Sequence, residues 1–86
     1  MTRFRWNDWN IEHITRHGVT PAEAEAVVVS GSLRRGGTGK YKAIGRGSAG
    51  RWIQAVYIFD PPGVVYVIHA RPLTHAEKRR VRRKLR

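Results

Sequence analysis

The last predicted strand and the basic tail after it hold the residues best suited to chemistry. The stretch "VVYVIHARPLTHAEKRR" passes from valine and isoleucine through His69 and Arg71 into a run of cations. Residues two apart on a strand point to the same side, so His69 and Arg71 are expected on one face of a sheet. Histidine transfers protons near neutral pH, and arginine holds phosphate with two hydrogen bonds. The pair predicts a phosphate-binding site at this strand end.

Metal-free cleavage of RNA is one reaction that such residues support. The 2′-hydroxyl attacks the neighbouring phosphate, so the reaction needs a base, cations beside the phosphate and an acid for the leaving 5′-oxygen. His17 is a second candidate proton carrier, and Tyr57 and Trp52 offer rings on which bases can stack. Candidate phosphate-binding cations stand at hairpin ends and in the tail: Lys40, Arg46, Arg51, Lys78, Arg79, Arg80, Arg82 and Arg83.

Each candidate also has an ordinary structural role open to it. A histidine before a helix-ending glycine, such as His17, can interact with the last helix carbonyls. His69 can be a core histidine, and Tyr57 and Trp52 can be core aromatic residues. Cations at hairpin ends or on a terminal helix can simply be solvated charge. The sequence leaves these alternatives open.

Signatures of metal and cofactor enzymes are lacking in the sequence. The stretch "GTGK" is too short for a Walker loop, and no helix is predicted after it. There is no serine in a nucleophile elbow and no suitable pair of acids. His13 and His17 have the four-residue spacing of helix-borne metal ligands, but no third ligand is evident. We therefore expect neither a metal nor a cofactor.

The charge of the chain indicates a strongly anionic partner. The 86 residues carry 17 Lys and Arg against 6 acids, a formal net charge of +11 at pH 7. Such a surplus destabilises a compact domain by self-repulsion, so a partner usually neutralises it. RNA or another nucleic acid and an acidic protein are the leading candidates. A membrane is not expected, because the basic tail lacks a broad apolar face.

Length and composition predict one domain, residues 1–86, in the cytoplasm. There is no cysteine, which excludes disulfides and thiolate zinc sites and suits a reducing compartment. The first residues, "MTRFRWNDWN", lack the apolar run of a signal peptide. No window is apolar enough to span a membrane.

Two short helices are expected first. Asn7 or Asp8 can cap a helix that ends before Gly18. A second helix starts at Pro21, after the N-cap Thr20, and Gly31 ends it.

A β-meander and a basic helix are expected next. The stretches "SLRR", "KYKAIGR", "RWIQAVYIF" and "VVYVIHAR" are strand-like, the first of them weakly, and short turns separate them. Thr74 and Glu77 form a capping box that starts the terminal helix. The fold class is therefore α+β, with an antiparallel four-stranded sheet whose helices cover one face and leave the other free. Its register is not determined by the sequence.

Several of these motifs resemble the BrnT family of bacterial type II toxins. "FRWNDWNIEHITRHGVTPAEAEAV" is similar to that family's opening, with its R-H-G-V segment and E-A-rich second helix. "KYKAIGR", "GRWIQAVY" and "VIHARPLTHAEKRR" are similar to its later strands and its A-R, T-x-x-E ending. The resemblance covers nearly the whole chain in order.

The resemblance implies a RelE-like fold and an endoribonuclease that halts translation and is inhibited by a cognate antitoxin protein. Carried across by position, the family's phosphate-handling cations fall on Lys40, Arg51 and Arg71, and its helix-end histidine on His17. Lys40 stands where the family usually has arginine, and His69 where serine is common. Two other functions stay open: a non-catalytic RNA- or ribosome-binding module, and a basic interaction protein neutralised by an acidic partner.

Overall fold

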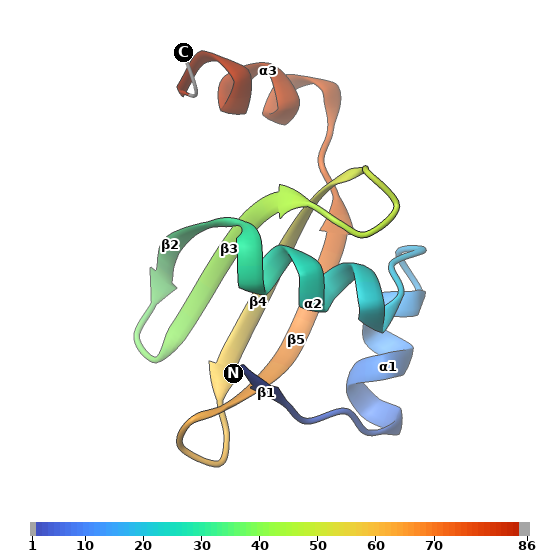
Figure 1. Ribbon diagram of the computed structural model, residues 1–86, viewed down its shortest axis with the longest axis vertical. Helices are drawn as coiled ribbons and strands as arrows, with labels where there is room; N and C mark the ends of the chain where they lie inside the picture. The colour runs from blue at the N-terminus through green and yellow to red at the C-terminus, as the bar shows by residue number, and fades with distance from the viewer. Residues whose placement is uncertain (1, 85–86) are drawn as a thin grey trace.

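The computed structural model describes residues 2–84, except for the side chains of residues 33–37 and 84 (Figure 1). The chain forms short helices around one sheet. In chain order the elements are β1 (Arg3–Phe4), α1 (Asp8–Thr15), α2 (Pro21–Ser30), β2 (Ser32–Gly37), β3 (Lys40–Arg46), β4 (Trp52–Phe59), β5 (Val64–Pro72) and α3 (His75–Lys84).

Each helix begins at the polar residue that the sequence predicts. Asn7 caps α1, because its side chain accepts a hydrogen bond from the backbone N–H three residues on. Thr20 and Glu23 bond reciprocally at the start of α2. Thr74 and Glu77 do the same before α3, with N···O distances of 2.8 and 3.2 Å. These bonds satisfy donors that a helix N-terminus otherwise leaves unpaired.

The sheet is five-stranded and mixed. Its strand order is β1-β5-β4-β3-β2, and β2 to β5 form the predicted antiparallel meander. The prediction of a purely antiparallel sheet was wrong, because β1 pairs with β5 in parallel, Arg3 opposite Val64. A two-residue strand has no alternation that a sequence pattern can reveal.

Only one helix lies across a face of the sheet. Figure 1 shows α2 crossing in front of β3 and β4, α1 flanking β5, and α3 projecting past the strand ends. The expectation that the helices share one face therefore does not describe α3. The core lies between α2 and the sheet and includes Ile14, Val19, Ala24, Val27, Ala43, Ile53, Ala55, Tyr57, Val65, Val67 and Ala70.

A β-bulge in β5 determines which residues face away from α2. Tyr57 pairs with Val67 but Val56 pairs with His69, so Ile68 is an extra residue. Strict alternation along β5 would put Val67 and His69 on one face, and the bulge places them on opposite faces. Val67 is buried in the core, whereas His69 is on the opposite side, with Arg71 two residues on.

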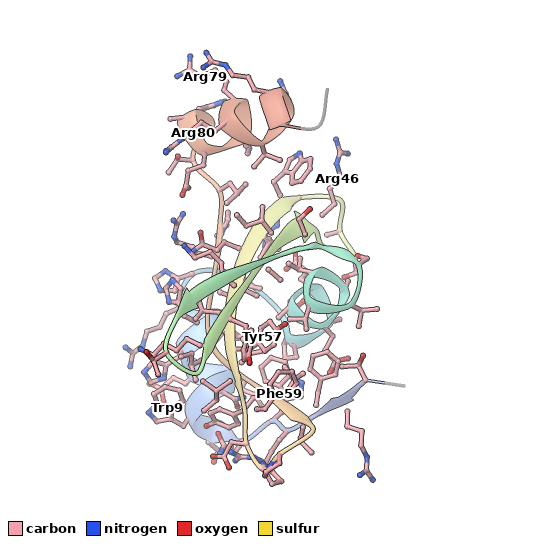
Figure 2. The ribbon with its side chains drawn as sticks, turned by 90° about the vertical axis from the view of Figure 1, so that its left-hand side faces the viewer. Trp9, Arg46, Tyr57, Phe59, Arg79 and Arg80 are labelled. Atoms are coloured by element: carbon pink, nitrogen blue, oxygen red, sulfur yellow. The ribbon has the colours of Figure 1, made fainter. Side chains whose placement is uncertain are left out.

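We call the side of the sheet opposite α2 the open face. Its residues on the three central strands are Lys42, Ile44, Arg46, Trp52, Gln54, Val56, Ile58, Tyr66, His69 and Arg71. Figure 2 shows α2 and Trp9 on opposite sides of the sheet. Within residues 2–84, no helix has the length and apolar character needed to cross a membrane.

Candidate functional site

Strand register places the predicted histidine and arginine in neighbouring cross-strand rows of the open face. Directly opposite residues in antiparallel strands have adjacent side chains, so each row is a contact unit. From β3 to β5, the rows are Lys42, Val56 and His69, and then Ile44, Gln54 and Arg71. His69 and Arg71 thus share a face, as predicted, and Lys42 joins them from β3.

A second histidine reaches this face from the end of α1. Gly18 adopts a left-handed backbone, with φ of +74°, and lets the chain turn sharply after His17. The ring of His17 then lies edge-on to that of His69, with centroids 5.0 Å apart and planes at 69°. Two sequence-predicted proton carriers, 52 positions apart in the chain, are brought into contact.

The surroundings of His69 favour its neutral form. Its pKa is lowered, first by partial burial and then by the positive charges of His17, Arg71 and His13. Burial and nearby cations both disfavour the imidazolium. A neutral imidazole near pH 7 is able to accept a proton.

An aromatic column continues the open face along α1. Trp9 and His13 are four residues apart on α1 and so lie on one side of the helix, and His17 follows in the turn after the helix end. The His13 ring stacks on Trp9 at 3.8 Å, and Trp9 stacks on Tyr66 at 6.2 Å between centroids. The Cζ atom of Arg5 is 3.9 Å from the centre of the Tyr66 ring. Sequence reasoning missed this column, although the W-x₃-H-x₃-H spacing indicates it.

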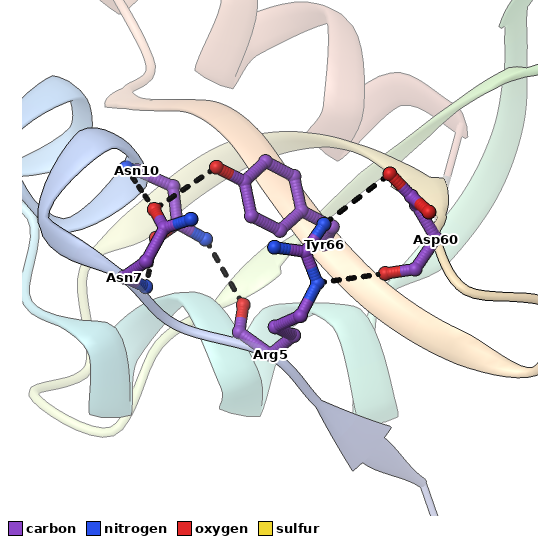
Figure 3. A network of polar contacts seen from close by, with 5 residues as sticks. All are labelled: Arg5, Asn7, Asn10, Asp60 and Tyr66. Carbon is purple, nitrogen blue, oxygen red and sulfur yellow. Dashed lines mark hydrogen bonds and ion pairs between the residues drawn. The ribbon is translucent and has the colours of Figure 1, made fainter.

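Polar contacts hold α1 and the column against β5 (Figure 3). The Tyr66 hydroxyl donates to Asn7 Oδ1 at 3.0 Å, and the Asn10 amide donates to the Arg5 carbonyl at 3.0 Å. Arg5 Nε donates to the Asp60 carbonyl at 2.9 Å. These contacts fix the start of α1, the helix that carries His13 and leads into His17.

Arg71 is occupied by a carboxylate from α3. Its two terminal nitrogens donate to the two oxygens of Glu77, each at 2.7 Å. Glu77 also accepts from the backbone N–H of Thr74 at 2.8 Å. Arg71, and then the Thr74 N–H, lower the pKa of Glu77 to about 2. The guanidinium edge suited to phosphate is therefore already paired within the chain.

Arg51 has a comparable ion pair on the other side of the sheet. Its Nε and Nη2 donate to Glu23 at 3.0 and 2.9 Å, and Nη2 also donates to the Gly18 carbonyl at 2.7 Å. The Glu23 side chain is only 5% exposed. Arg51 thus ties the α1–α2 joint to the start of β4 and does not join the open face.

The remaining predicted residues are dispersed. Tyr57 is 6% exposed in the core and stacks on Tyr41 at 5.6 Å, so the expectation that it stacks on RNA bases does not fit its position. Lys40 is exposed at the start of β3, beside the β2–β3 turn. Arg46 lies over the Trp52 ring, 5.3 Å from its centre, and the two form the last row of the open face, at the far end of β3.

The basic residues of α3 form a separate positive surface. Figure 2 shows Arg79 and Arg80 on this helix, beyond the end of the sheet. Arg79, Arg80, Arg82 and Arg83 are exposed, and Lys78 is half-buried. Their charge adds to that of Lys42, and clustered cations raise the local concentration of an anionic ligand.

Comparisons of the chain with protein-family models, with curated proteins and with solved structures find no match. The resemblance to BrnT toxins therefore rests on the motifs alone.

Proposed function

We propose that the protein is a ribonuclease that binds single-stranded RNA across the open face and cleaves it without a metal. The observation that carries the proposal is the contact between His17 and His69, with Arg71 and Lys42 beside them. Two proton carriers next to cations are the groups that RNA cleavage by its own 2′-hydroxyl requires.

In the proposed reaction His69 is the base. It takes the proton of the 2′-hydroxyl as that oxygen bonds to the adjacent phosphorus. The bond from phosphorus to the 5′-oxygen breaks, and His17 protonates that oxygen. The products are a 2′,3′-cyclic phosphate and a free 5′-hydroxyl. The lowered pKa of His69 keeps it ready to accept the proton near neutral pH.

Cations on the open face would stabilise the phosphate charge during the reaction. Lys42 shares a cross-strand row with His69. Arg71 would contribute once an RNA phosphate takes the place of Glu77, because both groups offer two oxygens to one guanidinium.

The wider biological role follows from the resemblance. We infer a toxin of a type II toxin–antitoxin pair with a RelE-like fold, acting in the cytoplasm to inhibit translation. A cognate antitoxin protein with acidic character would neutralise the net charge of +11. The α+β fold and the cations on the open face and α3 support this role.

A non-catalytic RNA-binding module is the second candidate. The paired state of Arg71 favours it, because the group expected to clamp the phosphate is held by Glu77. Such a module would bind RNA with steep salt dependence, log K falling by roughly 0.7 per phosphate neutralised on a single strand, and would leave the strand intact.

A matched pair of histidine variants tests the proposal. His69→Asn removes the base, whereas His75→Asn makes the same change at an exposed position at the start of α3. We expect His69→Asn to lower the cleavage rate by roughly 100-fold or more and His75→Asn to leave it within about twofold. Equal rates in the two variants would contradict the assignment of His69.

A further inference from the structure

A small cavity lies between the open face and α3. Its volume is about 220 Å³. It is lined by strand residues, by the segment before α3 and by α3 itself: Lys42, Ile44, Gln54, Leu73, Glu77, Arg80 and Val81. The cavity lies beside Arg71, because the lining residue Gln54 is directly opposite Arg71 in the neighbouring strand.

The residue that indicates a ligand is Gln54. It is only 8% exposed, yet among the described residues its side-chain amide forms no hydrogen bond. The described part of the chain also has no fully buried side-chain nitrogen or oxygen that lacks a partner, so the Gln54 amide is still reached by solvent, and Gln54 is one of the residues that line the cavity. An accessible amide in an otherwise buried side chain can bond to a ligand that displaces water from the cavity.

The lining defines the chemistry of that partner. The Gln54 amide offers one acceptor and two donors within one plane. Ile44, Leu73 and Val81 give apolar walls, and Lys42 and Arg80 bring positive charge. The Glu77 carboxylate is already bonded to Arg71 and to the Thr74 N–H. A planar group with a donor-acceptor edge and an attached phosphate fits all of these features.

We propose that this cavity holds the nucleobase of a nucleotide, with its edge bonded by Gln54 and its phosphate held by Lys42 and Arg80. The volume lies below the roughly 300–1,000 Å³ of clefts for drug-sized ligands, which suits a single base. This rests on the proposed binding of RNA. The inference goes further than that proposal: the cavity would select the nucleotide beside the cleaved bond by the identity of its base.

Two variants examine the cavity without altering the histidines. Gln54→Met keeps a long, unbranched side chain and removes the amide. Val81→Trp fills the cavity from α3, a site where no strand pairing is disturbed. Thermal unfolding of each variant establishes that it is folded before binding is measured.

The experiment measures binding of four 2′-O-methyl oligonucleotides, of A, C, G or U alone, and of the four nucleoside 5′-monophosphates. The 2′-O-methyl group prevents cleavage, so the result does not depend on catalysis. We expect one base to bind the wild-type protein roughly 5- to 100-fold better than the weakest, and both variants to lose that preference. Lys42→Gln should weaken all four oligonucleotides about equally.

The outcomes separate this inference from the proposed function. A preference seen with oligonucleotides identifies RNA as the source of the base, and the same preference among monophosphates identifies a free nucleotide. Equal binding of all four bases, or a preference retained by Gln54→Met, overturns the base pocket. If a base preference is present but RNA is never cleaved, the pocket stands and the ribonuclease proposal fails.

Discussion

Glu77, in the first turn of α3, holds both terminal nitrogens of Arg71 at 2.7 Å. The two residues are six apart, and the pair spans the bend between β5 and α3. The arginine best placed to bind phosphate on the open face is thus already paired with a carboxylate of the same chain. RNA and Glu77 would compete for one guanidinium.

Replacing this carboxylate should strengthen RNA binding. Glu77→Gln removes the charge but keeps the capping box, since glutamine also serves at that helix position. We expect affinity for a single-stranded oligonucleotide to rise roughly 3- to 10-fold. Glu12→Gln is the control, because it removes one acid from the exposed pair with Arg16 and leaves Arg71 paired. An equal gain in both variants would show a general charge effect.

The same pair should contribute stability that depends on pH. The pKa of Glu77 falls from 4.5 to about 2 in the folded protein. Its stabilising effect is therefore complete above about pH 4.5 and is lost as the pH falls toward 2. Urea unfolding gives the free energy of unfolding at pH 6 and at pH 3. Between these values the wild-type protein should lose roughly 1–2 kcal/mol more of this free energy than Glu77→Gln does. The difference is modest because the pair is partly exposed and screened by solvent. Parallel losses in the two proteins would exclude this linkage.

The pH profile of cleavage should reflect the lowered pKa of His69. Because the base must be neutral, the acid limb of kcat/KM should have its midpoint below the ordinary histidine value of 6.5. Arg71 is one of the charges that lower this pKa. Arg71→Gln should therefore move the acid limb upward, while also reducing the rate. An unmoved limb would place the titrating base elsewhere.

Arg51 should matter more for folding than for RNA. Arg51→Met leaves the Glu23 carboxylate buried without its partner, and we expect a clear loss in the free energy of unfolding. Arg16→Met breaks an exposed pair and should cost less than about 0.5 kcal/mol. Chemical denaturation compares the two. A large loss of RNA cleavage in Arg51→Met at unchanged stability would show that Arg51 acts in RNA cleavage and contradict its assignment to folding.

Local signals predicted the elements well. The capping residues Asn7, Thr20 and Thr74 mark the helix starts, because a cap is a contact between residues close in sequence. The antiparallel meander followed from its short turns. The sequence did not predict features that depend on contacts between residues distant in the chain, such as the pairing of β1 with β5.

The site was predictable in its residue types but not in its geometry. The sequence indicated His17, His69 and Arg71 and placed the last two on one face. It could not show that the Ile68 bulge turns His69 away from Val67, or that His17 contacts His69. The sequence indicates Arg51 and Arg71 as phosphate-binding cations, but only the fold reveals that Glu23 and Glu77 pair with them. No sequence pattern marks Gln54, because the feature that distinguishes it is its burial beside a cavity, which only the fold shows.

The proposed function requires that RNA bound on the open face is cleaved by attack of the RNA's own 2′-hydroxyl. The most direct measurement incubates the purified protein, in EDTA, with an end-labelled RNA and with the same RNA carrying 2′-O-methyl groups. We predict cleavage of the unmodified RNA alone, with a 2′,3′-cyclic phosphate at the new end. Cleavage of both RNAs, or of neither, would contradict the account.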